Sequence, residues 1–259
     1  CAAVLVCWQP DAAISGLPKI KSNLNGTKIP GYLGLRVLVA KAIDENGVGS
    51  DESVADSVDW CNQNDVDIIS MSLGGSQSFA SGILVTDQLE QSVNEALDSG
   101  VFVIASAGND GEDIDAGDNF PTPFLNDGSR ARNWIEVGAA NWQVDSLAAT
   151  FSNYGQNAVD LFSPGVDILS TVPGSEYERE DGTSMASPVV SGVAALLMAY
   201  FPNLDASEVR RILLESSVKR QDDVLARPGD GARIPFGRLS VTGGVVNAYE
   251  AVKVVLAGM

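Results

Sequence analysis

Short apolar runs alternate with longer segments of helical periodicity along most of this chain. Residues 36–43, 66–71 and 101–106 are rich in β-branched side chains and nearly continuous in apolar positions, which predicts strands covered on both faces. Between them, apolar residues recur every three or four positions over 52–64 and again up to Gly100, which predicts helices. Strands separated by helices of this length pair in parallel through right-handed crossovers. The pattern predicts an α/β fold, a doubly wound and mostly parallel sheet with helices on both faces.

The second half of the chain continues the pattern after a stretch at 107–133 that is rich in Gly, Asp and Asn and is expected to be a loop. A helix over 183–201 has no polar face, which predicts a buried central helix. Polar, charged residues at 219–235 predict an exposed loop. The remaining expected elements are strands over 134–140, 147–151, 159–162 and 168–172, a helix capped by Asp205 that runs to about 217, and a last helix over 245–256.

The first 34 residues differ from the rest, because they carry several prolines and glycines and show no clear period. We therefore divide the chain into an irregular N-terminal segment, 1–34, and an α/β domain, 35–259. A chain of 259 residues with 45% hydrophobic content is long enough to bury one sizeable core.

Charge and cysteine content narrow the classes of partner. With 34 acidic against 16 basic residues the net charge is −18, and such a surface repels the phosphates of nucleic acids. It suits a secreted or cell-surface protein. No apolar run reaches the roughly 18 residues of a membrane span, and the oligomeric state is left open. Cys1, Cys7 and Cys61 indicate neither a disulfide framework nor a zinc site, so Cys61 is expected to be a small buried hydrophobic residue.

The first candidate for chemistry is Ser184, in the run GTSMASP at 182–188. It lies at the start of the expected central helix, where unpaired amides and the helix dipole favour a developing oxyanion. Its own backbone N–H could donate to that oxygen. A serine that merely caps a helix is the simpler interpretation of this run taken alone.

Two further runs favour a catalytic role for Ser184 over a simple helix cap. Asn109, in SAGND at 106–110, directly follows a strand, at the edge where sites form in open parallel sheets. Its side-chain amide could be the second donor to an oxyanion. The preceding strand ends in SMSLGG at 70–75, a glycine-rich edge where an extended peptide could pair through backbone hydrogen bonds.

These three runs, in this order, resemble the subtilisin family of serine endopeptidases, and the resemblance covers about 35–251. It implies that the α/β domain is a subtilisin-like peptidase domain lacking its N-terminal part, and that the substrate is a polypeptide. Ser184 would be the acylated nucleophile and Asn109 the oxyanion donor. The substrate-binding residues would be Ser72, Leu73 and Gly74 on one wall, Ala107 and Gly108 on the wall of the pocket for the residue before the scissile bond, and Thr183.

The catalytic aspartate and histidine of the family have no counterpart in this chain. It contains no histidine, and Asp11 lies in a setting unlike the family's Asp-Ser/Thr-Gly turn. In subtilisin itself, loss of the histidine lowers turnover on the order of a millionfold, so this chain alone is expected to be nearly inactive. A carboxylate base of the sedolisin type and a Ser-Lys dyad with Lys19, Lys21, Lys28 or Lys41 have no support in the sequence. The alternative is a non-catalytic pseudoprotease that binds extended peptides.

No cofactor is predicted with certainty. Two acidic groups of residues lie in expected loops, and oxygen-rich loops can hold calcium. Neither group has EF-hand spacing, so a solvated acidic surface is the preferred interpretation. Asp110, beside the oxyanion candidate, is expected to lie at the mouth of the specificity pocket and to favour basic side chains there. The two acidic groups are Asp110, Glu112, Asp113, Asp115 and Asp118, and Asp44, Asn46, Asp51 and Glu52.

Overall fold

A single large sheet organises the part of the chain that the computed structural model describes, residues 5–10, 26–28, 35–43, 49–73, 75–76, 87–116, 119–125, 128–172 and 174–258. Within those residues its nine strands have the order β12-β15-β9-β8-β6-β4-β1-β3-β2. The strands are β1 (Leu5–Pro10), β2 (Gly26–Lys28), β3 (Leu35–Ala40), β4 (Ile68–Met71), β6 (Phe102–Ser106), β8 (Trp134–Ala140), β9 (Leu161–Pro164), β12 (Val218–Lys219) and β15 (Gly244–Val245).

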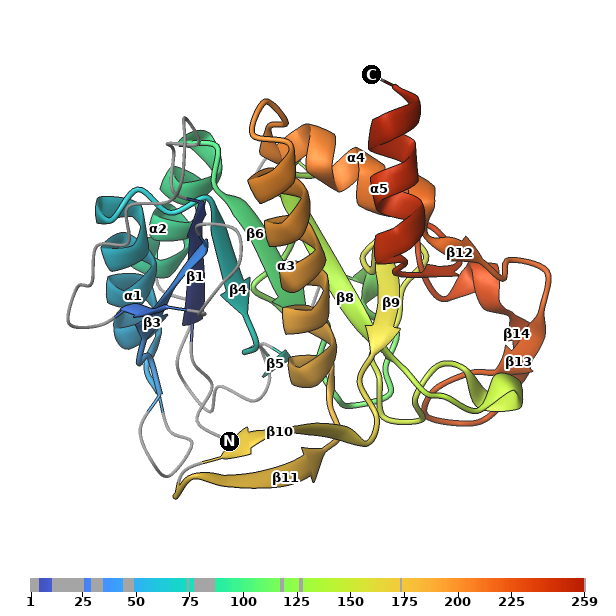
Figure 1. Ribbon diagram of the computed structural model, residues 1–259. Coiled ribbons are helices and arrows are strands. Elements are labelled where there is room, and N and C mark those ends of the chain that lie inside the picture. Colours follow the sequence, from blue (N-terminus) through green and yellow to red (C-terminus); the bar gives the residue numbers. More distant parts are fainter. Residues whose placement is uncertain are drawn as a thin grey trace.

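Helices cover both faces of this sheet, and three small antiparallel pairs flank it (Figure 1). The pairs are β5 (Gly75–Ser76) with β7 (Asn119–Phe120), β10 (Ile168–Val172) with β11 (Glu176–Glu180), and β13 (Val224–Ala226) with β14 (Arg233–Pro235). The helices are α1 (Asp51–Gln63), α2 (Asp87–Asp98), α3 (Thr183–Tyr200), α4 (Ala206–Ser216) and α5 (Ala248–Ala257), with 3-10 turns η1 (Ile114–Ala116), η2 (Val144–Ser146) and η3 (Phe236–Arg238).

The predicted α/β architecture is confirmed at the centre of the sheet, where β4, β6, β8, β9 and β15 are parallel to one another. Every residue of β4, β6 and β8 is buried, because helices lie on both sides. Alternate residues face opposite layers: Ile104 contacts the core under α3, α4 and α5, and its neighbour Val103 contacts the core under α1 and α2. Double coverage explains why the strands are apolar without interruption.

Local signals set the ends of the helices. Asp205 caps α4 as predicted, with its side chain accepting from the backbone N–H of Glu208 and the Glu208 side chain accepting from that of Asp205. Ser50 caps α1 in the same way. Gly100, with φ of 85°, takes the left-handed conformation that ends the α2 segment, and its N–H donates to Leu97.

The sheet departs from the predicted parallel order at its N-terminal strands. β1 and β2 fall within residues 1–34, which gave no predicted element, and β1 lies between β3 and β4, antiparallel to both. β3 and β4 therefore run in the same direction, as the two strands of a β3-α1-β4 unit should, with β1 inserted between them. The division at residue 34 stays a prediction, although the sheet itself continues across it.

Two other expectations are wrong. Residues 147–151 do not form a strand: Ala148 makes one bridge to Ala140, and the chain then turns. The segment 219–235 is not a simple loop, since β13 and β14 pair within it and Leu225 is buried. In both places the packing of a short segment on its neighbours decides its structure.

Helix α3 is the central helix that the sequence predicts, and it packs across β4, β6, β8 and β9. It is not covered on every side, however. One stripe along it stays half-buried or exposed, and includes Met185, Pro188, Val193 and Tyr200. By length and composition α3 could also cross a membrane, but burial of its other sides against the sheet already accounts for its apolar sequence.

Cys61, on α1, is fully buried and disulfide-bonded, so the expectation of a simple buried hydrophobic residue is wrong. The side chains of the other two cysteines, Cys1 and Cys7, lie outside the described residues. An odd number of cysteines in the sequence therefore did not exclude a disulfide.

Loss of this disulfide should destabilise the fold. Removal of a native disulfide typically costs about 2 to 5 kcal/mol. We expect Cys61→Ala to lower the melting temperature by on the order of 10 °C, as measured by circular dichroism. Dithiothreitol should lower it by a similar amount in the unmodified protein and have no further effect on Cys61→Ala. Equal sensitivity of the two proteins to the reductant would contradict the assignment.

A buried charged cluster lies near the start of β8. Asp160 is fully buried and forms ion pairs with Arg130 and with Arg210, the latter at 2.7 Å between Oδ1 and Nη2. Glu136 is also fully buried; its Oε2 accepts from Trp134 Nε1 at 2.9 Å, and its Oε1 has no hydrogen-bond partner in the described part of the chain. Burial raises the pKa of Glu136 to about 8, although the Trp134 hydrogen bond and the charge of Arg130 oppose the shift.

The raised pKa of Glu136 makes the stability of the fold depend on pH. Between the ordinary pKa of 4.5 and the raised value of about 8, the unfolded chain ionises Glu136 while the folded chain keeps it protonated. Stability should therefore fall as pH rises through this window, by at most about 1.4 kcal/mol per pH unit. Glu136→Gln keeps an acceptor for Trp134 and should remove this component, so urea unfolding from pH 5 to pH 8 should show a flatter profile for the variant. If the stability of the two proteins changes equally with pH, Glu136 does not have this effect.

Candidate active site

The predicted nucleophile lies where the sequence places it, in the first turn of α3. Ser184 is the second residue of the helix and is half-buried. Its hydroxyl lies 3.4 Å from the carbonyl oxygen of Ser72, a long hydrogen bond in which Ser184 donates. The N–H of Met185 donates to the carbonyl of Gly182 at the helix cap. The N–H groups of Thr183 and Ser184, which come before it, have no carbonyl partner within the helix, so this end of α3 can donate to a negatively charged oxygen.

Asn109, three residues beyond the end of β6, is held against the same helix turn. Its Oδ1 accepts two hydrogen bonds from Thr183, one from the backbone N–H at 2.9 Å and one from the hydroxyl at 3.0 Å. Because the oxygen is engaged in this way, the amide nitrogen must face elsewhere. A Cβ atom placed on Gly182 would lie 3.4 Å from Met185 Sδ, 3.6 Å from the Ser184 backbone nitrogen and 3.7 Å from Asn109 Nδ2. The two predicted donors therefore lie near one point beside Gly182, with the Met185 side chain next to it.

Thr183 connects the two sides of this arrangement. It is fully buried, donates its hydroxyl proton to Asn109, and accepts from the backbone N–H of Gly108 at 3.2 Å. These contacts suit a residue that orients Asn109 better than one that touches substrate directly. Of the predicted substrate-binding residues, Thr183 is therefore the one whose surroundings differ most from the expectation.

The predicted walls of the cleft are found at the ends of adjacent strands. Ser72 and Leu73 follow β4 and are half-buried, and Leu73 packs against the core under α1 and α2. The Ser72 hydroxyl donates to the carbonyl oxygen of Ser184 at 2.9 Å. Gly74 lies outside the described residues.

The second wall depends on a residue that the sequence analysis missed. Asn153 is buried; its Nδ2 donates to the carbonyl of Ala107, and its Oδ1 accepts from the backbone N–H groups of Asp110 and Glu112. Gly108 has φ of 100°, and a Cβ there would lie 2.5 Å from Asn153 Nδ2. Asn153 therefore fixes the loop that carries Asn109. The only sequence signal was a polar pair, Ser152-Asn153, immediately after an apolar run.

No proton acceptor for the Ser184 hydroxyl is found in the described part of the chain other than the Ser72 carbonyl, which is not a base. The chain contains no histidine. Asp11, Lys19 and Lys21 lie outside the described residues, as does the side chain of Lys28. The geometry thus contains the groups that would bind an oxyanion and omits the group that would accept a proton.

The acidic loops contain no group of three metal-binding side chains among the residues that the structure describes. Asp115 serves a structural purpose, since its carboxylate accepts from the backbone N–H groups of Asn157 and Ala158, both at 2.8 Å. Asp44, Asn46 and Asp118 lie outside the described residues. The calcium hypothesis for these loops stays a prediction.

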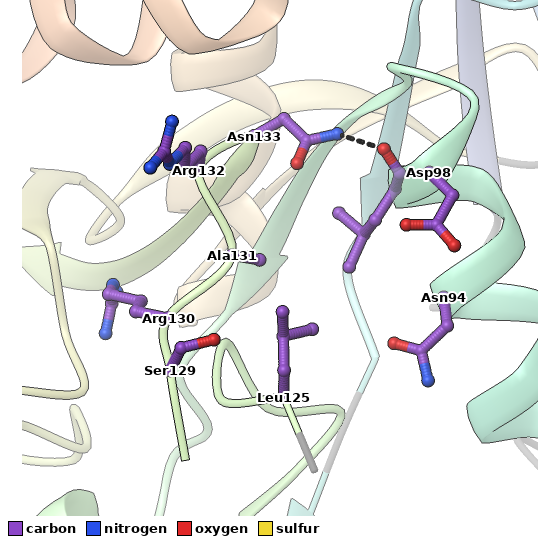
Figure 2. Close-up of a pocket in the computed structure, with 9 residues that line it drawn as sticks. Asn94, Asp98, Leu125, Ser129, Arg130, Ala131, Arg132 and Asn133 are labelled. Atoms are coloured by element: carbon purple, nitrogen blue, oxygen red, sulfur yellow. Dashed lines mark hydrogen bonds between the residues drawn. The ribbon is translucent and has the colours of Figure 1, made fainter. Parts of the chain in front are cut away.

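A pocket of roughly 440 Å³ lies elsewhere in the molecule (Figure 2). Asn133 donates from Nδ2 to the carbonyl of Leu97 in its wall. Its residues come from the end of α2 and from 125–133, which lead into the amino ends of β6 and β8. Asn109 follows the carboxyl end of β6. This pocket therefore belongs to the opposite edge of the sheet and is separate from the candidate site.

Comparison with known proteins agrees with the geometry. Residues 20–231 match the model of the subtilase family, Peptidase_S8. The chain is 35% identical over 240 residues to a thermophilic serine proteinase of Bacillus sp. (strain AK1), an alignment that covers 92% of this chain and 51% of that protein. It is 34% identical over 183 residues to subtilisin DY of Bacillus licheniformis, covering 70% of this chain and 61% of that protein. It spans about half to three-fifths of the length of these relatives.

Solved structures show the same relationship. A cold-adapted subtilisin-like serine proteinase aligns with a TM-score of 0.59 at 29% identity, over 78% of this chain and 65% of that one. The prenylagaramide maturation protease PagA aligns with a TM-score of 0.62 at 26% identity, over 81% of this chain and 70% of that one. On the family match and these identities, the chain belongs to the subtilase family.

Proposed function

We propose that this chain is the nucleophile-bearing part of a subtilisin-class serine endopeptidase, which hydrolyses polypeptides through an acyl-enzyme on Ser184. The observation that carries the proposal is the common space bordered by the Ser184 backbone nitrogen and Asn109 Nδ2, at 3.6 and 3.7 Å from one point. Two fixed donors around one site, next to a serine hydroxyl, are what acyl transfer requires.

In this mechanism the Ser184 hydroxyl attacks the scissile carbonyl carbon, and the carbonyl oxygen becomes an oxyanion in that space. Asn109 stabilises it because Thr183 holds the amide group through its oxygen, which leaves Nδ2 to donate to the oxyanion. The substrate backbone extends along the segment that follows β4, at Ser72 and Leu73. The leaving amine receives the proton that Ser184 gave up, through a base that this chain does not supply.

The base would come from a polypeptide segment additional to this chain. Support for that part of the proposal comes from the chain's lack of histidine and from its coverage of only 51% of one relative's length. The half-buried apolar stripe of α3 also begins next to Ser184, at Met185, and offers a surface on which such a segment could pack. Alone, the chain should retain oxyanion binding and react slowly.

We also propose that the protein works outside the cytoplasm. Disulfides such as that of Cys61 form and persist mainly in oxidising compartments, and a net charge of −18 suits an exposed protein surface.

The proposed roles can be tested with a fluorophosphonate probe, which labels activated serines. We expect slow labelling of this chain that is abolished by Ser184→Ala and lowered on the order of a hundredfold or more by Asn109→Leu. Intact mass spectrometry gives the extent of labelling over time. Ser170→Ala, which removes an exposed hydroxyl on β10, is the matched control and should not change the rate.

Two outcomes would contradict the proposal. Fast, stoichiometric labelling of the isolated chain would show that a working base is present after all. Labelling that is unaffected by Asn109→Leu would remove the oxyanion role and would favour the pseudoprotease alternative, in which the chain binds extended peptides without forming an acyl-enzyme.

Asp110 should influence substrate preference. It is exposed, follows the oxyanion donor, and has its backbone fixed by Asn153. An exposed carboxylate contributes at most about 1 kcal/mol, or roughly fivefold in rate. We expect peptidyl diphenyl phosphonates with lysine before the reactive group to label faster than leucine analogues, and Asp110→Asn to remove most of this difference. Glu112→Gln, which removes a nearby exposed carboxylate, is the control. An equal effect of both changes would indicate general charge attraction.

A further inference from the structure

We propose that Ser72 is a positioning residue for the nucleophile, and that Pro188 is the reason why one is needed. The inference rests on the proposed role of Ser184, and it goes beyond the role of Ser72 as part of the substrate wall. It concerns the carbonyl oxygen of Ser184, a group that takes no part in bond making.

Pro188 lies inside α3, six residues after the Gly182 cap. In an α-helix the N–H of residue 188 would donate to the carbonyl of residue 184, but proline has no N–H and its ring crowds that carbonyl. The ladder is present two bonds earlier, since the N–H of Ala186 donates to Gly182 at 3.3 Å. The helix therefore leaves the carbonyl of the nucleophile itself without its usual donor.

Ser72 provides a replacement from a distant part of the chain. Its hydroxyl donates to the Ser184 carbonyl at 2.9 Å, across 112 positions of sequence. In the opposite direction, the Ser184 hydroxyl lies 3.4 Å from the Ser72 carbonyl. A half-buried carbonyl with no donor would be unfavourable, so this bond both satisfies the group and ties it to the end of β4.

The first turn of α3 is thereby held from two adjacent strands. Asn109, after β6, binds the N–H of Thr183, and Ser72, after β4, binds the carbonyl of Ser184. Both bonds act on the peptide units around the Ser184 N–H, which is one of the two oxyanion donors. A shift of that turn by a fraction of an ångström would change the distance between this N–H and Asn109 Nδ2. Ser72 therefore fixes the spacing of the oxyanion site.

The body of the helix has its own attachments to the same strands. The Ser187 hydroxyl donates to the Ile104 carbonyl on β6 at 3.1 Å, and the Ser191 hydroxyl donates to Ser70 on β4 at 2.9 Å. Removal of the Ser72 hydroxyl should therefore leave α3 docked and affect mainly its first turn. Ser191 gives a matched control, because its hydroxyl joins α3 to β4 two turns away from the nucleophile.

A double-mutant cycle on the full chain tests the coupling. With Pro188 present, Ser72→Ala should lower the limiting rate of fluorophosphonate labelling about tenfold, and Ser72→Thr should restore most of it. In the Pro188→Ala background, residue 188 regains an N–H that can donate to Ser184, so Ser72→Ala should lower the rate less than about twofold. Equal factors in the two backgrounds would overturn the proposal, as would no effect of Ser72→Ala.

Thermal unfolding separates positioning from stability. Ser72→Ala and Ser191→Ala should each lower the melting temperature by roughly 2–4 °C, but only Ser72→Ala should slow labelling. A comparable loss of labelling in Ser191→Ala would overturn the positioning role. If the effects of Ser72→Ala and Pro188→Ala are additive while Asn109→Leu still slows labelling, this inference is overturned and the proposed function stands. If Ser184 is not labelled at all, both the proposed function and the positioning role are overturned.

Discussion

The candidate site depends on how the first turn of a buried helix meets the carboxyl ends of two parallel strands. A helix start has N–H groups with no partners in the helix, and in α3 an internal proline adds a carbonyl in the same condition. Asn109 satisfies one of these groups and Ser72 the other. The same bonds that satisfy this helix end also fix the two proposed oxyanion donors. Helix capping and the proposed catalytic role are therefore compatible interpretations of the same residues.

The supports of this arrangement come from several distant parts of the chain. Asn153 holds the loop that follows β6 through three hydrogen bonds to its backbone. Small residues let α3 lie close to the sheet, where the hydroxyls of Ser187 and Ser191 bond to β6 and to the Ser70 hydroxyl on β4. A buried polar group of this kind stabilises one geometry only when its partners are all in place. This explains why the site is held by side chains that never meet a substrate.

The incompleteness of the catalytic set has structural counterparts. β1 lies antiparallel between two strands that run in the same direction, and the helix that bears Ser184 keeps an apolar stripe that is only half-covered. Helix α1, which packs against β3 and β1, is further restrained by the disulfide at Cys61.

The sequence by itself determined the parallel centre of the sheet and the central helix, because these rest on local periodicity. Its short runs also proposed Ser184 and Asn109 as site residues, and these roles stay predictions. It could not determine the insertion of β1, the disulfide of Cys61, the β13–β14 pair, or the structural role of Asn153. Each of these depends on contacts between residues far apart in the chain, and short segments have too little local preference to specify them. The pairing of Ser72 with Ser184 is of the same kind. The sequence shows that Pro188 lacks an N–H, but only the folded chain shows that the Ser72 hydroxyl donates to the Ser184 carbonyl instead.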